Sequence, residues 1–100
     1  MIYITQLIYI KEGKEEVFNE FEEVAMPIIS KYNGKLLLRL RPEENAFIEA
    51  NMNKPYEIHL VEFKNDGDFE NFMNDEERRK FLPLKEQSIQ SSILFKGTKI

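Results

Sequence analysis

Glu62 is the first residue whose type and position suit it to chemistry. It alternates with Tyr56, Ile58 and Leu60, so its carboxylate shares a mostly apolar strand face. If that face lines an interior, removal of water would suit the carboxylate to act as a general acid or base. The alternative is a carboxylate at a strand end that pairs with Arg39 or reaches solvent.

Arg39 is the second candidate. It lies beside Leu37 in the strand-like segment 35–41. A buried guanidinium needs a carboxylate or a ligand anion as its partner. Arg39 and Glu62 are therefore candidate catalytic residues, which either bind each other or act together on a ligand. Strand register cannot be read from the sequence, so their contact is a hypothesis.

His59, Tyr56 and Tyr3 are candidate ligand-binding residues. His59 is the single histidine and falls within the strand-like segment 56–63, where a packed or surface ring is the simpler interpretation. Tyr3 and Tyr56 carry hydroxyl groups that suit a pocket, although tyrosines at such positions also serve as core or dimer contacts.

Composition excludes several classes of function. The chain has 100 residues and 11.9 kDa, which predicts one domain over residues 1–100. It has no cysteine and one histidine, so thiolate nucleophiles and sites with two histidine ligands are excluded, and we expect no metal and no cofactor.

Charge and hydropathy argue against nucleic acid and membrane partners. The chain has fourteen basic and eighteen acidic residues. Its only basic triplet, Arg78 to Lys80, directly follows the acidic residues Asp75 to Glu77. No apolar run approaches the roughly 18–20 residues of a membrane-spanning helix, and the first residues lack a basic leader. We therefore expect a soluble, cytoplasmic protein.

Periodicity predicts six main elements in the order β-α-β-β-α-β. The expected segments are a strand (2–10), a helix (14–32) interrupted at Pro27, a strand (35–41) with Leu36, Leu38 and Leu40 on one face, a long connection (42–55), a strand (56–63), helical turns starting near Asn65 and Asp75 and reaching residue 91, and a strand (93–96). This order is the ferredoxin-like plan, an α+β fold with an antiparallel sheet.

The first and third strands carry large apolar residues on both faces. Helices in a ferredoxin-like plan cover only one face of the sheet. A second copy of the chain is the simplest cover for the other face, so we expect a homodimer formed through the sheet.

Three segments resemble a family of small, uncharacterised dimeric α/β-barrel proteins. They are MPIISKYNGKLLLR (26–39), VEF (61–63) and FLPLKEQS (81–88), with Asn33 where the family has the first glycine of a Gly-Gly turn. The residues Asp75 to Arg78 replace the family's Ser-Pro-Glu-Tyr. The resemblance implies a dimeric α/β barrel and no settled activity. It places the chain in a superfamily that also contains cofactor-free monooxygenases, lactone isomerases, haem-degrading enzymes and stress-responsive proteins.

Two functions follow as hypotheses. The first is an uncharacterised small dimer that binds a small lipophilic ligand between sheet and helices. The alternative is a cofactor-free isomerase or monooxygenase that acts on a small organic substrate, with Glu62 as general base and Arg39 holding the resulting anion. The chain has no tryptophan, which the haem-degrading and many quinone-forming relatives use, so those two activities are disfavoured.

Overall fold

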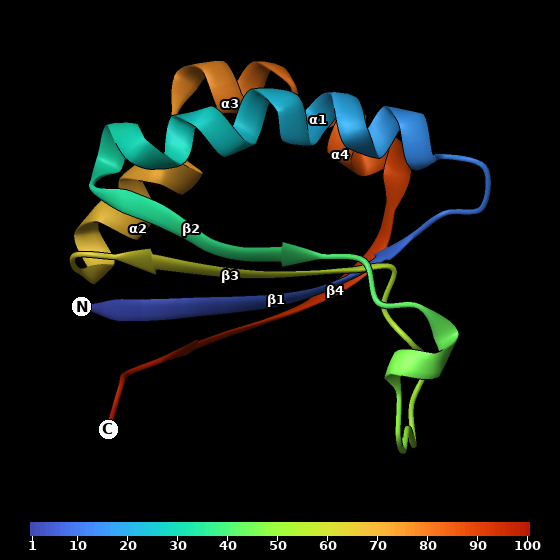
Figure 1. Cartoon of the computed structure of the whole chain (residues 1–100). Helices are drawn as coiled ribbons and strands as arrows, with labels where there is room; N and C mark the ends of the chain where they lie inside the picture. Colours follow the sequence, from blue (N-terminus) through green and yellow to red (C-terminus); the bar gives the residue numbers. More distant parts are fainter.

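Four strands form one sheet, and the four α-helices lie over the same face of it (Figure 1). The computed structural model describes all 100 residues. Its elements are β1 (Ile2–Ile10), α1 (Glu15–Ile28), η1 (Ile29–Tyr32), β2 (Gly34–Leu40), η2 (Glu44–Ala46), β3 (Glu57–Phe63), α2 (Asp66–Met73), α3 (Glu76–Lys80), α4 (Leu82–Ser88) and β4 (Ile89–Gly97). The predicted β-α-β-β-α-β order is confirmed, with the second helical region divided into three short helices.

The strand order is β2-β3-β1-β4, and each neighbouring pair is antiparallel. This is the ferredoxin-like topology that the element order predicted. Side chains alternate between the two faces of such a sheet. Ile4 and Ile8 of β1 therefore point to the helices and are buried, whereas Tyr3 and Leu7 point to the uncovered side, which we call the open face.

Helix α1 forms because its buried residues recur at helical spacing. Phe18, Phe21, Ala25 and Ile28 lie along one side and pack between the helices and the sheet. The break expected at Pro27 is a change from α-helix to a 3-10 turn after Ile28. The chain leaves that turn at Asn33, whose φ of 58° is the left-handed conformation that asparagine adopts more readily than most residues.

Strand β2 contains an irregularity that reverses one prediction. Its register against β3 shifts between Leu36 and Leu38. An extra residue at such a bulge changes which side chains share a face. Leu36 is level with buried Val61, whereas Leu38 is level with Leu60 on the open face. The prediction that Leu36 and Leu38 lie on one face is therefore wrong.

The second half of the chain starts its helices with the side-chain caps that the sequence indicated. The Asn65 side chain accepts a hydrogen bond from the Asp68 amide at 2.8 Å, and Asp75 accepts one from the Arg78 amide at 2.9 Å. The last strand starts at Ile89, four residues earlier than expected, because its backbone pairs with β1 as far as Ile10.

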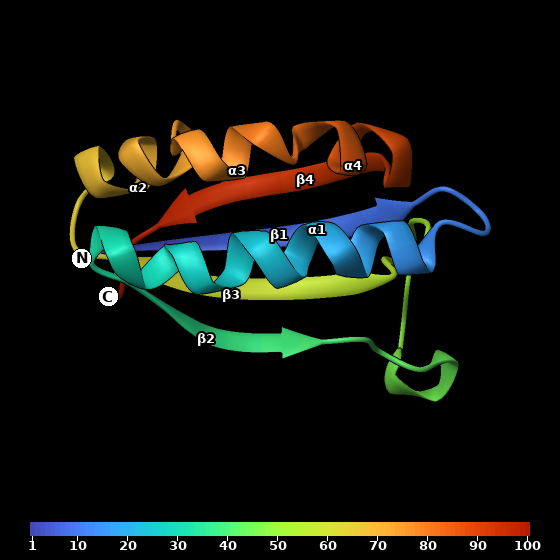
Figure 2. The same ribbon diagram turned by 90° about the horizontal axis from the view of Figure 1, so that it is seen from above.

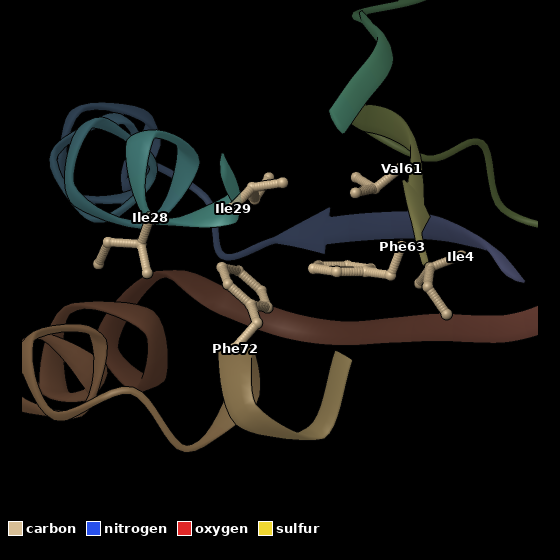
Figure 3. Close-up of a cluster of buried hydrophobic side chains, with 6 residues drawn as sticks. All are labelled: Ile4, Ile28, Ile29, Val61, Phe63 and Phe72. Carbon is tan, nitrogen blue, oxygen red and sulfur yellow. The ribbon is translucent and has the colours of Figure 1, made fainter. Parts of the chain in front are cut away.

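The core is a single layer between sheet and helices. Figure 3 shows one cluster in which Ile4, Val61 and Phe63 from the sheet meet Ile28, Ile29 and Phe72 from the helical side. The molecule measures 36 × 35 × 16 Å, a slab two layers thick. Seen from the helical side, the helices extend along the sheet (Figure 2), and the connection 41–56 projects beyond the other side of the sheet (Figure 1).

Candidate ligand-binding cavity

A partly enclosed cavity of about 130 Å³ lies between the sheet and the helices. Twelve of its eighteen lining residues are hydrophobic, among them Phe21, Ala25, Val61, Phe72 and Leu94. Its polar residues are Gln6 of β1, Glu22 of α1, His59 of β3, Arg78 of α3, Lys85 of α4 and Ser92 of β4. A mostly apolar wall with a few polar groups is the usual composition of a small-molecule site.

Glu57 is a fully buried carboxylate that three side chains hold beside the cavity. Arg39 Nε lies 2.8 Å from its Oε2, Arg41 Nε lies 2.7 Å from its Oε1, and His59 Nε2 also bonds to Oε2. Burial alone would raise the pKa of Glu57, but the hydrogen bonds from His59, Arg39 and Arg41 outweigh it and lower that pKa to about 2. Glu57 therefore stays ionised and anchors the group.

His59 is the one predicted site residue that lines the cavity. Its ring is buried because β3 directs Glu57, His59, Val61 and Phe63 to the helices. The ring bonds to Glu57 through Nε2 and makes no hydrogen bond through Nδ1. One side of the imidazole is thus fixed by a carboxylate, and the other nitrogen is free to meet a ligand.

Glu22 brings a second polar group to the same cavity. The residue is only 5% exposed, yet its carboxyl group makes no hydrogen bond or ion pair with any other side chain. Burial raises the pKa of Glu22, and the smaller opposing effects of His59 and Arg39 do not cancel that shift. A buried carboxyl group with these properties is an unusual feature of a protein interior and a common one of binding sites.

Two cationic residues complete the polar part of the wall. Arg78 is held by a hydrogen bond from Nη1 to the Met73 carbonyl oxygen (3.2 Å) and by the rings of Phe21 and Phe72, 5.7 and 5.1 Å from its guanidinium carbon. Its Nε is buried without an acceptor. Burial lowers the pKa of Lys85, and the nearby charge of Arg78 lowers it further.

The other predicted site residues lie outside the cavity. Glu62 is on the open face, level with Tyr3 and Lys35, so the expected contact between Arg39 and Glu62 is not made. Arg39 is paired with Glu57, and both residues border a shallow surface depression separate from the cavity.

Tyr3 and Tyr56 also lie away from the cavity lining. Tyr3 is on the open face, level with Glu62. The Tyr56 ring packs edge-on against Phe18, 5.9 Å between centroids, and under the guanidinium of Arg41. Neither tyrosine is among the residues that line the cavity.

Sequence reasoning missed Glu22 and Glu57, although both carried a signal. Glu22 is four residues after Phe18 and three before Ala25, which places it inside the buried stripe of α1. Glu57 alternates with His59 on β3 and therefore shares its face. In both cases the signal is a charged residue at a position where the periodicity predicts a buried apolar side chain.

Two further observations bear on partners. No group of three or more His, Cys, Asp or Glu side chains is placed to hold a metal ion. None of the helices is long and apolar enough to span a bilayer.

Comparison with known proteins identifies the fold. No protein-family model matches the sequence, and no curated protein does either. Among solved structures, a protein of unknown function from Rhodopseudomonas palustris superposes with a TM-score of 0.83 at 13% identity, over 99% of this chain and 82% of that one.

Two further solved structures agree with this assignment. A NIPSNAP family protein of unknown function from Agrobacterium tumefaciens gives a TM-score of 0.70 at 19% identity, over 97% and 86% of the two chains. A dimeric protein of unknown function with a ferredoxin-like fold from Bacteroides fragilis gives 0.69 at 14% identity, over 96% and 93%. The chain is a ferredoxin-like α+β protein, similar in fold to proteins of unknown function.

Proposed function

We propose that the protein binds a small, mostly apolar molecule in the cavity between sheet and helices. The supporting observation is the cavity itself, about 130 Å³ in volume with a largely apolar wall. An apolar cavity of roughly 150 Å³ accepts a benzene molecule. The expected ligand is therefore about as large as one six-membered ring.

The alternative function, with Glu62 as general base, is not favoured. Glu62 lies on the open face, level with Tyr3 and Lys35, and does not line the cavity. A base must come within hydrogen-bond reach of the proton that it removes. A ligand held between sheet and helices is on the wrong side of the sheet for this carboxylate.

Toluene is a suitable first probe because its size fits the cavity and it carries no polar group. We expect toluene at millimolar concentration to shift the NMR resonances of lining residues such as Ile4, Val61 and Leu94. Ala25→Leu adds side-chain volume to the wall and should weaken this binding at least about tenfold. Ala46→Leu, at an exposed position in η2, is the matched control. Absence of shifts in the unmodified protein would contradict the proposal.

We also propose that a second copy covers the open face. Its residues include the exposed side chains Leu38, Leu40, Ile93 and Phe95, the last 51% exposed. The chain exposes 6756 Å², whereas a monomer of its mass exposes about 5,900 Å². A thin slab with one uncovered sheet face exposes more surface than a compact monomer of the same mass. One structural relative is described as dimeric, which supports this assembly.

A further inference from the structure

We propose that Glu22 and His59 together recognise a neutral hydroxyl group, so that the ligand is a small alcohol or phenol. This inference rests on the proposed binding function and names the chemical class of the ligand. Both residues line the cavity, both are at least nine-tenths buried, and each leaves a polar atom there without a protein partner.

The hydrogen bond between His59 and Glu57 decides what the imidazole offers to a ligand. Ionised Glu57 can only accept hydrogen bonds, so His59 Nε2 carries the proton that it donates. In the neutral ring, Nδ1 is then an acceptor. Arg39 and Arg41 hold Glu57 from the β2 side, which fixes the plane of the ring. The cavity therefore presents a fixed acceptor to a ligand that can donate.

Glu22 presents a second group without a hydrogen-bond partner to the cavity, from the helical side. It lies on α1, over the sheet that carries His59, and makes no hydrogen bond or ion pair of its own. A carboxyl group in a mostly apolar wall, with no hydrogen bond to the protein, is available to bond to a molecule in the cavity. A ligand that donates to this carboxyl group, or accepts from it when protonated, supplies the missing hydrogen bond. A hydroxyl group does both.

The cavity wall carries groups of both signs, so an ionised ligand of either sign meets a like charge there as well as an opposite one. Arg78 and Lys85 line the same wall and repel an ammonium group. Glu22 and the Nδ1 lone pair of His59 repel a carboxylate. A hydroxyl group is neutral, donates to Nδ1 or to Glu22, and accepts with its oxygen, so it satisfies the acceptors and is repelled by neither sign of charge.

Binding of four ring compounds tests this assignment. Phenol, toluene, benzoate and benzylamine share one ring and differ in the polar group. We expect phenol to bind about tenfold more tightly than toluene, and benzoate and benzylamine to bind more weakly than toluene. Phenol should also shift the ¹⁵N resonance of His59 Nδ1, a readout that needs no substitution.

Substitutions at two neighbouring glutamates separate recognition from general effects. Glu22→Met replaces the carboxyl group with an apolar side chain of similar length and should reduce the preference for phenol over toluene to less than about threefold. Glu23→Met is the control, because Glu23 is exposed and does not line the cavity. His59→Phe should abolish the preference while leaving toluene binding in place.

The outcomes distinguish this inference from the function on which it rests. If neither toluene nor phenol binds, both are overturned. If toluene binds as tightly as phenol, or benzoate binds more tightly than both, the cavity is a binding site but the hydroxyl assignment is wrong. Retention of the full phenol preference by Glu22→Met and His59→Phe would also overturn it.

Discussion

At the scale of single residues, the carboxylate of Glu57 holds together the cluster formed with Arg39, Arg41 and His59. Its side chain is fully buried, whereas Arg39 and Arg41 still reach water. Glu57→Gln would leave two guanidinium groups and His59 without their carboxylate. We expect a loss of about 3 kcal/mol in unfolding free energy at pH 7, the lower end of the range for breaking a buried ion pair. Urea unfolding measures it.

The pH dependence of this loss follows from the lowered pKa of Glu57. Its pKa is about 2 in the folded protein against 4.5 ordinarily. The stabilisation is therefore complete above about pH 5 and disappears as pH falls towards 2. The difference between wild type and Glu57→Gln should shrink over the same interval. Glu49→Gln, at an exposed position, should behave as wild type throughout, and a difference independent of pH would show that Glu57 acts through packing alone.

Glu22 should have the opposite effect on stability. Burial raises its pKa in the folded protein, so its ionisation favours the unfolded chain. The neutral isostere Glu22→Gln should therefore raise the midpoint of thermal unfolding by a few degrees at pH 7. The gain should disappear near pH 4, where the wild-type carboxyl group is protonated in both states. Equal midpoints at pH 7 would mean that burial of Glu22 does not destabilise the folded protein. Glu23→Gln, at an exposed position, is the control.

At the scale of elements, the junction between η1 and β2 depends on the small size of Gly34. A Cβ atom there would lie 2.6 Å from Phe63 Cε1, 2.7 Å from Ile29 Cγ2 and 2.9 Å from the Ile29 carbonyl oxygen. We expect Gly34→Ala to cost about 2–3 kcal/mol in unfolding free energy, because a core ring and the backbone must both move. Gly97→Ala places its Cβ in open space and should change stability by less than about 0.5 kcal/mol. Equal effects of the two substitutions would contradict this.

Most elements could be predicted from the sequence because periodicity and turn residues carry local information. Local sequence was enough to indicate the turn at Asn33 and the helix starts near Asn65 and Asp75. The register shift after Leu36 could not be recognised in this way. A single extra residue leaves no clear pattern in a run of leucines, so the shift is visible only from the pairing with β3.

Local sequence carries less information about the candidate site. His59 could be named from its residue type, and Arg39 was expected to meet a carboxylate or a ligand anion. Which carboxylate pairs with Arg39 depends on the register between β2 and β3. Alternation of side chains along one strand carries no information about that register. Glu22 comes from a helix, and only packing of the helices on the sheet brings it to the cavity with His59.

At the scale of the whole molecule, the two faces of the sheet have different roles. The helix-covered face holds the buried core and the cavity. The open face carries exposed apolar side chains, and the connection 41–56 projects on that side with Ile48 and Met52 exposed (Figure 1). This connection lies on the side of the sheet that the proposed second copy would cover. Its hydrogen bond from Tyr9 Oη to the Asn53 carbonyl oxygen, at 2.6 Å, fastens it to the sheet.

A charge on the open face should separate the proposed dimer. Leu38→Arg and Phe95→Arg each place a guanidinium on the open face, where two copies would bring two such charges together without partners. We expect sedimentation equilibrium to show a dimer for the wild type and a dissociation constant at least about a hundredfold higher for each variant. Asn71→Arg adds the same charge on the exposed side of α2 and should remain dimeric. The variants should keep the far-ultraviolet circular dichroism of the wild type, because the substituted side chains already lie at the surface of the monomer. A wild-type protein that sediments as 11.9 kDa at 100 micromolar would leave the open face without the partner proposed for it.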